Sequence, residues 1–268
     1  MAIKTTFFLI IVLLLTGCAS GPSQFIGHPY AGDPAQGFDI PAADKKTLLI
    51  FNHGSRAEGY RDYCRPTPWI VPQVIRQLNG KIINGKEIMV YNFCSTPKGE
   101  YRGVARQGEP KLMKRVQNIE ALVRDFQAAG VPAQQLFLVG HSAGGWASLL
   151  AVQRQQVSVN AVIAFGPAFA GKQQTRSSGW QALRDQQAQL LANTPHVDGL
   201  VYSFADDPYE SSDDLAFLGK ISGIRLIAVD ESMCRAPHLH RTAFRDCFEQ
   251  SQSRVIFDFI AAQLSNEQ

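Results

Sequence analysis

The chain is poor in charged residues and has no cluster of like charges. Only 18% of its 268 residues are charged, and the formal net charge is +3. Because no run of Lys or Arg occurs, nothing in the sequence indicates a nucleic-acid partner. Repeats and low-complexity segments are also absent, and 45% of the residues are hydrophobic. This composition is typical of an ordinary globular protein.

The apolar run at residues 7–15 is too short to span a membrane comfortably. It follows Lys4 and ends in Leu15-Thr16-Gly17-Cys18, which resembles a bacterial lipobox. The resemblance implies cleavage before Cys18 and acylation of that residue on its sulfur and its new amino group. Several acyl chains on one residue give stable anchoring to a lipid membrane. The alternative is an ordinary signal peptide with an incidental cysteine.

Three segments follow from this interpretation. Residues 1–17 are expected to be a lipoprotein signal peptide, and residues 18–44 the lipidated cysteine with a tether rich in Gly, Pro, Ser and Ala. Residues 45–268 suit one domain with a sizeable core. Since Ala19 stands where Asp would signal retention, sorting rules predict the outer membrane, facing the periplasm, in a cell with two membranes.

Cysteine is scarce, with five residues in the chain, and four remain once Cys18 is set aside. An even number beyond an export signal predicts disulfides, and four cysteines allow three connectivities. We favour the pairs Cys64–Cys94 and Cys234–Cys247, because each would join segments near one end of the expected sheet. Free buried thiols are the alternative.

Apolar runs of strand length alternate with longer helical patterns. Strands are predicted at residues 47–52, 87–92, 136–139, 160–165, 200–204 and 224–229. Helices are predicted at residues 68–78, 111–129, 144–155, 179–191, 213–218 and 255–264. This alternation predicts an α/β fold with a mostly parallel central sheet and helices on both faces. In such sheets ligands bind beyond the carboxyl ends of the strands, so the residues that follow each strand matter most.

The sequence Gly140-His141-Ser142-Ala143-Gly144 lies between a predicted strand and a predicted helix. A Gly-x-Ser-x-Gly in this position resembles the nucleophile elbow of the α/β-hydrolase fold. The resemblance implies that Ser142 attacks a carbonyl carbon and that the Ala143 N–H faces the developing oxyanion. His141 resembles the same residue in many esterases, where it is structural.

The first predicted strand is followed by His53-Gly54-Ser55. This resembles the His-Gly segment whose loop supplies the second oxyanion N–H in α/β-hydrolases. Carried across, the Ser55 N–H is the expected donor, with Gly54 as the neighbour that permits the turn and the alternative donor. A plain glycine turn is the structural alternative.

An Asp and a His follow Ser142 in the chain order of the hydrolase triad. A serine hydroxyl needs an imidazole to accept its proton, and the imidazole needs a carboxylate to fix its tautomer. Asp207 is the expected acid, because the family often has Asp-Pro in that loop, and Asp206 is the alternative. His238 is the expected base, because the family's histidine commonly opens the loop after the last strand, and His240 is the alternative.

A zinc site at Cys234, His238 and His240 is a weaker interpretation, since it lacks a fourth ligand and uses a cysteine better explained by a disulfide. The hydrolase resemblance requires no metal and no organic cofactor.

The resemblance covers residues 45–265 and is closest to esterase-like and dienelactone-hydrolase-like enzymes. It implies a serine hydrolase that acts on a carboxylic ester or related small acyl substrate. An acyltransferase, a peptidase, or a non-catalytic envelope-binding protein on the same scaffold are the alternatives. Only one helix separates the strand at 160–165 from Leu200, so no large lid domain is expected. Residues 175–178 and 91–108 are expected to border the pocket.

Overall fold

The computed structural model of the chain describes residues 23–27, 38–55, 66–94, 108–235 and 239–265. The predicted signal peptide, Cys18, Cys64 and His238 lie outside these residues. None of the helices within the described ranges has both the length and the hydrophobicity needed to cross a membrane.

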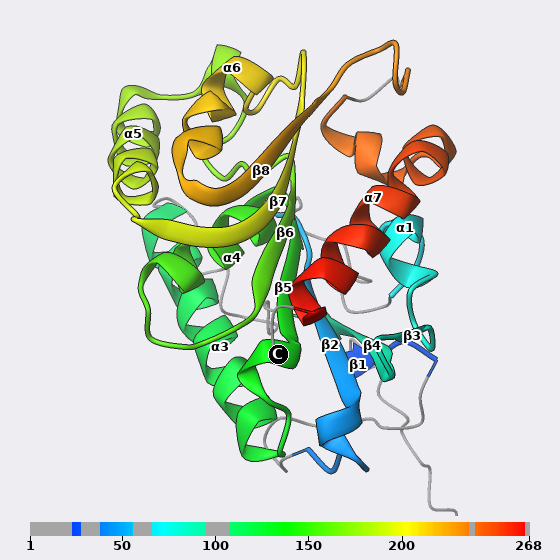
Figure 1. Cartoon of the computed structure of the whole chain (residues 1–268). Coiled ribbons are helices and arrows are strands. Elements are labelled where there is room, and N and C mark those ends of the chain that lie inside the picture. The colour runs from blue at the N-terminus through cyan, green and yellow to red at the C-terminus, as the bar shows by residue number, and fades with distance from the viewer. Residues whose placement is uncertain (1–22, 28–37, 56–65, 95–107, 236–238, 266–268) are drawn as a thin grey trace, which may run out of the picture.

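An eight-stranded sheet runs through the middle of the domain (Figure 1). The strands lie in the order β1-β4-β2-β5-β6-β7-β8, with β3 on β4. They are β1 (Gln24–Phe25), β2 (Lys46–Asn52), β3 (Ile82–Ile83), β4 (Lys86–Phe93), β5 (Leu136–His141), β6 (Ala161–Phe165), β7 (His196–Phe204) and β8 (Ser222–Val229). The short strands β1 and β3 are antiparallel to β4, and every other pair is parallel.

Helices cover both faces of the sheet. The longer α-helices are α3 (Gly108–Ala128), α4 (Ala143–Gln153), α5 (Ser178–Ala192) and α7 (Asp246–Ser265), and the single-turn ones are α1 (Gln73–Arg76) and α6 (Ser212–Leu215). In Figure 1 α3, α4 and α5 lie on one side of the sheet and α1 and α7 on the other. Each face has its own buried apolar cluster, because the central strands are apolar on both sides. The predicted fold class is therefore confirmed.

Part of the segment expected as a tether packs onto this domain. Strand β1 pairs with β4, and Phe25 is 3% exposed in the core beside Tyr91 and Phe126. Ile40 is also buried in the same cluster. Two-residue strands such as β1 carry too little periodicity to be read from the sequence.

Two helices differ from their expected bounds. The helix expected at 68–78 is reduced to α1, because Pro72 takes an extended conformation as its N-cap and cannot continue a helix from residue 68. The last helix, α7, begins at Asp246 rather than at residue 255. Its first turns are mostly polar, but Phe248 is fully buried and fixes them against the sheet.

Candidate active site

Ser142 stands between the end of β5 and the first residue of α4. Its backbone has φ 55° and ψ −125°, a conformation that residues with a Cβ rarely adopt. The Trp146 N–H donates to the Ser142 carbonyl at 3.0 Å, which starts the helix immediately after the turn. Strain of this kind persists only where the surroundings enforce it, and it is often found at functional residues.

The two glycines of the motif allow the strand and helix to come this close. A Cβ on Gly144 would lie 2.0 Å from the Asn52 carbonyl oxygen, and a Cβ on Gly140 would lie 2.5 Å from the Gly144 carbonyl carbon. Both clashes are with backbone atoms, which cannot move aside. The spacing Gly-x-Ser-x-Gly is thus a packing requirement of this turn.

Ser142, His240 and Asp207 form a continuous hydrogen-bonded chain. The Ser142 Oγ lies 2.8 Å from His240 Nε2, and His240 Nδ1 lies 2.6 Å from Asp207 Oδ2. Since an ionised carboxylate can only accept, His240 Nδ1 carries the proton and Nε2 accepts from the serine hydroxyl. The Ser142 Oγ lies farther, 3.3 Å, from the Ala168 carbonyl oxygen.

Asp207 is a buried residue of the loop after β7. Its side chain is fully buried, so its charge depends on hydrogen bonds for stability. The second carboxylate oxygen, Oδ1, accepts the Tyr209 N–H at 2.9 Å. The Tyr209 ring lies against the imidazole of His240, with centroids 4.3 Å apart. Asp207 is therefore fixed at both oxygens.

These side chains open into a pocket of about 560 Å³ at the carboxyl ends of the strands. Its walls combine apolar and polar side chains, and Lys172, Asp206 and Arg241 add charge. The lining residues are His53, Gly54, Ser55, Ile70, His141, Ser142, Ala168, Phe169, Gly171, Lys172, Asp206, Pro208, Tyr209, Leu239, His240, Arg241 and Phe244.

Comparison with known proteins shows which family and which folds the chain resembles. A family model described as serine aminopeptidase, S33 matches residues 100–218, which is under half of the chain. The match includes Ser142 and Asp207 and ends before His240. No curated protein sequence matches the chain significantly.

Solved structures resemble the whole domain at low sequence identity. A predicted CIB-like hydrolase from Thermoplasma acidophilum has a TM-score of 0.54 at 15% identity, over 90% of this chain and 97% of that one. Est1E from Butyrivibrio proteoclasticus has a TM-score of 0.54 at 13% identity, over 91% and 99% of the two chains. A monoacylglycerol lipase from Paleococcus ferrophilus has a TM-score of 0.53 at 13% identity, over 81% and 94%.

The chain has the α/β-hydrolase fold. Residues 166–195, all described, contain only a 3-10 turn (Gln173–Thr175) and α5 between β6 and β7. The hydrolase fold therefore carries no large lid domain at this point, as predicted.

The hydrolase fold brings the predicted oxyanion segment beside the elbow. Gly54 is so close that a Cβ there would lie 3.0 Å from the Ser142 Cβ, and Ser55 lines the pocket. Ala143 is the first residue of α4, and the N–H groups of a first helical turn have no partner within the helix. Both predicted donors thus belong to segments that border Ser142.

The structure favours His240 over His238 as the partner of Ser142, the reverse of the order expected from the sequence. His240, the second choice, makes both hydrogen bonds of the chain, and the expected His238 lies outside the described residues. Asp206, the alternative to Asp207, has an exposed side chain on the pocket wall, and it is Asp207 that His240 contacts.

His240 belongs to a 3-10 segment (Leu239–Phe244) that neighbouring residues hold in place. His141 Nε2 lies 2.7 Å from the backbone carbonyl oxygen of His240, so the residue before the nucleophile donates to the segment that carries the imidazole. On the other side, Arg241 donates to the Trp69 carbonyl at 2.7 Å and lies over the Phe244 ring. A structural role was expected for His141 from the sequence, but its contact with the His240 carbonyl was not.

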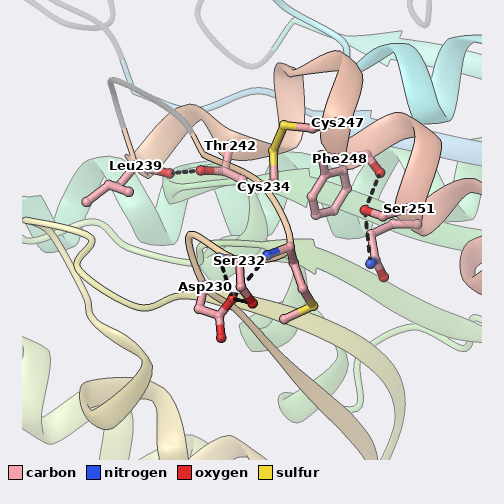
Figure 2. The surroundings of a disulfide bond; sticks show 10 residues. Asp230, Ser232, Cys234, Leu239, Thr242, Cys247, Phe248 and Ser251 are labelled. Carbon is pink, nitrogen blue, oxygen red and sulfur yellow. Dashed lines mark hydrogen bonds between the residues drawn. A yellow bond between two sulfur atoms is a disulfide. The ribbon is translucent and has the colours of Figure 1, made fainter.

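The segment between β8 and α7 is closed by a disulfide. Cys234 and Cys247 are bonded, with Cα atoms 5.3 Å apart, and this is the pairing expected from the sequence. Figure 2 shows the bond joining the loop after Asp230 to the start of the last helix. Hydrogen bonds from Ser232 and Met233 to the carboxylate of Asp230 lower its pKa below the usual value. Cys94 is also disulfide-bonded, while Cys64, its expected partner, lies outside the described residues.

The zinc interpretation does not fit this arrangement. Cys234 is engaged in the disulfide, and both ring nitrogens of His240 face Asp207 and Ser142. Within the described ranges, no cluster of His, Cys, Asp and Glu could hold a metal ion.

The pocket wall after β6 also differs from expectation. It is formed by Ala168, Phe169, Gly171 and Lys172 rather than by residues 175–178. Tyr91, at the start of the second expected segment, is buried in the core, and residues 95–107 lie outside the described part.

Proposed function

We propose that this protein is a serine hydrolase that cleaves a carboxylic ester or related acyl substrate. The observation that carries the proposal is the chain of hydrogen bonds from Ser142 through His240 to Asp207, at 2.8 and 2.6 Å, which ends in an open pocket. A serine on a strained turn beside an imidazole with a buried carboxylate is the arrangement that nucleophilic acyl transfer requires.

In the first half of the reaction, the Ser142 Oγ attacks the acyl carbonyl carbon while His240 Nε2 takes the hydroxyl proton. The Asp207 carboxylate stabilises the imidazolium that results. The tetrahedral intermediate then collapses, and His240 returns the proton to the departing alcohol. An acyl-enzyme on Ser142 and a free alcohol are the products of this step.

In the second half, water attacks the acyl-enzyme by the same route. His240 accepts a proton from the water and passes it to the Ser142 Oγ as the acid leaves. We assign the oxyanion to the N–H groups of Ala143 and Ser55, since each lies on a segment that borders Ser142. Gly54 is the alternative to Ser55. No metal or organic cofactor enters either step.

The pocket favours a small or extended acyl substrate. Its lining includes the exposed residues Lys172 and Asp206 as well as the apolar side chains of Ile70 and Phe169. The absence of a large domain over residues 166–195 is consistent with direct access from solvent.

We further propose that acylated Cys18 anchors the enzyme to a membrane, with the active site outside the cytoplasm. Two observations support this: the lipobox ending in Cys18, and disulfides at Cys94 and between Cys234 and Cys247. Disulfides persist mainly in oxidising compartments.

A panel of ester, thioester and peptide substrates on the purified chain tests the function. We expect turnover of short aryl and alkyl esters that is abolished in S142A. Faster turnover of peptides with a free N-terminus would favour the aminopeptidase alternative, which the family description supports. Product formed only with an added alcohol or amine acceptor would favour acyl transfer. No turnover and no reaction at Ser142 would favour a binding protein.

A further inference from the structure

A buried carboxylate lies between two arginines behind the loop that carries Asp207. Glu210 is fully buried, with Oε1 2.8 Å from Arg176 Nη2 and Oε2 2.8 Å from Arg184 Nη2. Burial raises the pKa of Glu210, and Arg184 and then Arg176 act in the opposite direction. A buried ion pair of this kind contributes little net stability, so its role is better sought in what it orients.

Arg176 holds two walls of the pocket at once. Its Nη2 donates to the Tyr209 carbonyl at 2.6 Å, to the Gly171 carbonyl at 3.0 Å and to Glu210. Gly171 and Tyr209 both line the pocket, the first after β6 and the second after β7. The side chain of Arg176 is itself only 3% exposed. One guanidinium therefore joins the two loops from behind.

Tyr209 connects this guanidinium to the catalytic acid and base. Its N–H donates to Asp207 Oδ1, and its ring lies 4.3 Å from the imidazole of His240. A shift of the Tyr209 backbone would thus move the support of Asp207 and the contact with His240 together. The Gln173 N–H also joins the two loops, donating to the Pro208 carbonyl at 2.9 Å.

Arg184 provides a contrast, because it shares Glu210 but does not line the pocket. It donates to the Asp214 carbonyl at 2.7 Å and lies 5.9 Å from the Trp146 ring centroid and 5.7 Å from that of Phe217. No hydrogen bond that the structure gives for Arg184 reaches Tyr209 or Gly171. Both arginines therefore pair with Glu210, but only Arg176 also contacts the Tyr209 backbone in the loop that carries Asp207.

We propose that Arg176 is a positioning residue for the Ser142–His240–Asp207 chain. Anchored by Glu210, it fixes the Tyr209 backbone and through it the orientation of Asp207 and His240. This inference rests on the proposed function, since it assigns Arg176 a part in the same reaction.

The test compares R176K with R184K in the full-length chain, using hydrolysis of p-nitrophenyl acetate. Both variants keep a positive charge beside Glu210, but a lysine ammonium cannot reproduce the several hydrogen bonds that a planar guanidinium donates. We expect R176K to lower kcat by about tenfold or more with KM changed less than about threefold, since small displacements of catalytic groups cost that much. R184K should keep kcat within about twofold of the parent, because the hydrogen bonds of Arg184 go to Glu210, Asp185 and Asp214 and none reaches Tyr209 or Gly171.

A double-mutant cycle with D207A isolates the route of the effect. If Arg176 acts through Asp207, adding R176K to D207A should cost less than about twofold in kcat. Equal losses in R176K and R184K, or a full R176K effect in the D207A background, would overturn the proposal. If circular dichroism shows that R176K is unfolded at the assay temperature, R176Q/E210Q replaces R176K and R184Q/E210Q replaces R184K in the comparison.

The activity of the parent protein distinguishes failure of the positioning role from failure of the proposed serine-hydrolase function. A parent that turns over the ester and loses activity in S142A, but shows no difference between the arginine variants, contradicts the positioning role alone. A parent that neither turns over the ester nor reacts at Ser142 contradicts the proposed function, and the positioning role with it.

Discussion

The imidazole of His240 makes both hydrogen bonds of the proposed catalytic chain, to Ser142 and to Asp207. His240 is anchored through its backbone carbonyl to His141, and its ring lies against Tyr209. We therefore expect H240Q to lower kcat by about 10³-fold or more, as loss of a triad base does in other serine hydrolases. H238Q should stay near the parent value. Steady-state hydrolysis of an aryl ester measures both, and a greater loss in H238Q would reverse the assignment.

Asp207 and Asp206 offer a second matched pair. Asp207 is fully buried with both oxygens engaged, whereas Asp206 is exposed on the pocket wall. D207N keeps the shape but favours the wrong imidazole tautomer, so we expect kcat to fall by about 10⁴-fold. D206N should change it by less than about threefold, as expected for an exposed position. The ratio of the two kcat values is the measurement, and comparable losses would contradict the choice of Asp207.

These residues mark how far the sequence can identify the site. Ser142 and the segment at Gly54 follow predicted strands in motifs that resemble those of the family. Asp207 was preferred to Asp206 because of its position after a strand and the family's Asp-Pro. The choice between His238 and His240 was not predictable, since it depends on the path of a loop between a disulfide and a 3-10 turn. Arg176 and Glu210 carry no motif, and only their shared burial reveals them.

The disulfide closes the segment that carries His240, the proposed catalytic base. Cys234 lies after β8 and Cys247 in the first turn of α7, with His240 between them. We expect C234S/C247S to lose about 3 kcal/mol of unfolding free energy, the usual value for a loop of this length. At moderate temperature the variant should remain folded but lose kcat, because His240 is less firmly placed.

Thermal unfolding followed by circular dichroism, together with ester kinetics, checks this expectation. The variant C64S/C94S is the control. It removes the other expected cysteine pair, which is far from His240 in the sequence. Unchanged kcat in C234S/C247S, or an equal loss in the control, contradicts a bracing role.

The elements themselves were largely predictable, and the exceptions have physical causes. Buried parallel strands read as plain apolar runs, so β2, β4, β5 and β6 lie within two residues of their expected bounds. β7 begins at His196 instead of at residue 200, and β8, in which only Val229 is buried, begins at Ser222 instead of at residue 224. The first turns of α7 were missed because they are mostly polar, and β1 because two residues show no period. The helix expected at residues 68–78 included Pro72, which in the structure is the N-cap residue before α1.

We propose that the molecule as a whole is one hydrolase domain on a lipid anchor at Cys18. Replacing Cys18 with serine removes the sulfur that lipidation needs, so the C18S chain should leave the membrane fraction and fail to incorporate labelled palmitate. Its ester turnover should match the parent once detergent is present, because Cys18 precedes the domain in sequence. Phase separation in a non-ionic detergent measures the first effect. A C18S chain that still partitions with detergent contradicts the anchor.

The central claim is that Ser142 is an activated nucleophile, and covalent labelling tests it most directly. The purified chain is treated with a fluorophosphonate, digested and mapped by mass spectrometry, with S142A and H240Q treated in parallel. We predict one adduct on the peptide that contains Ser142, none in S142A and much slower labelling in H240Q. Folded parent protein that takes up no label, or an adduct that persists in S142A, would contradict the account.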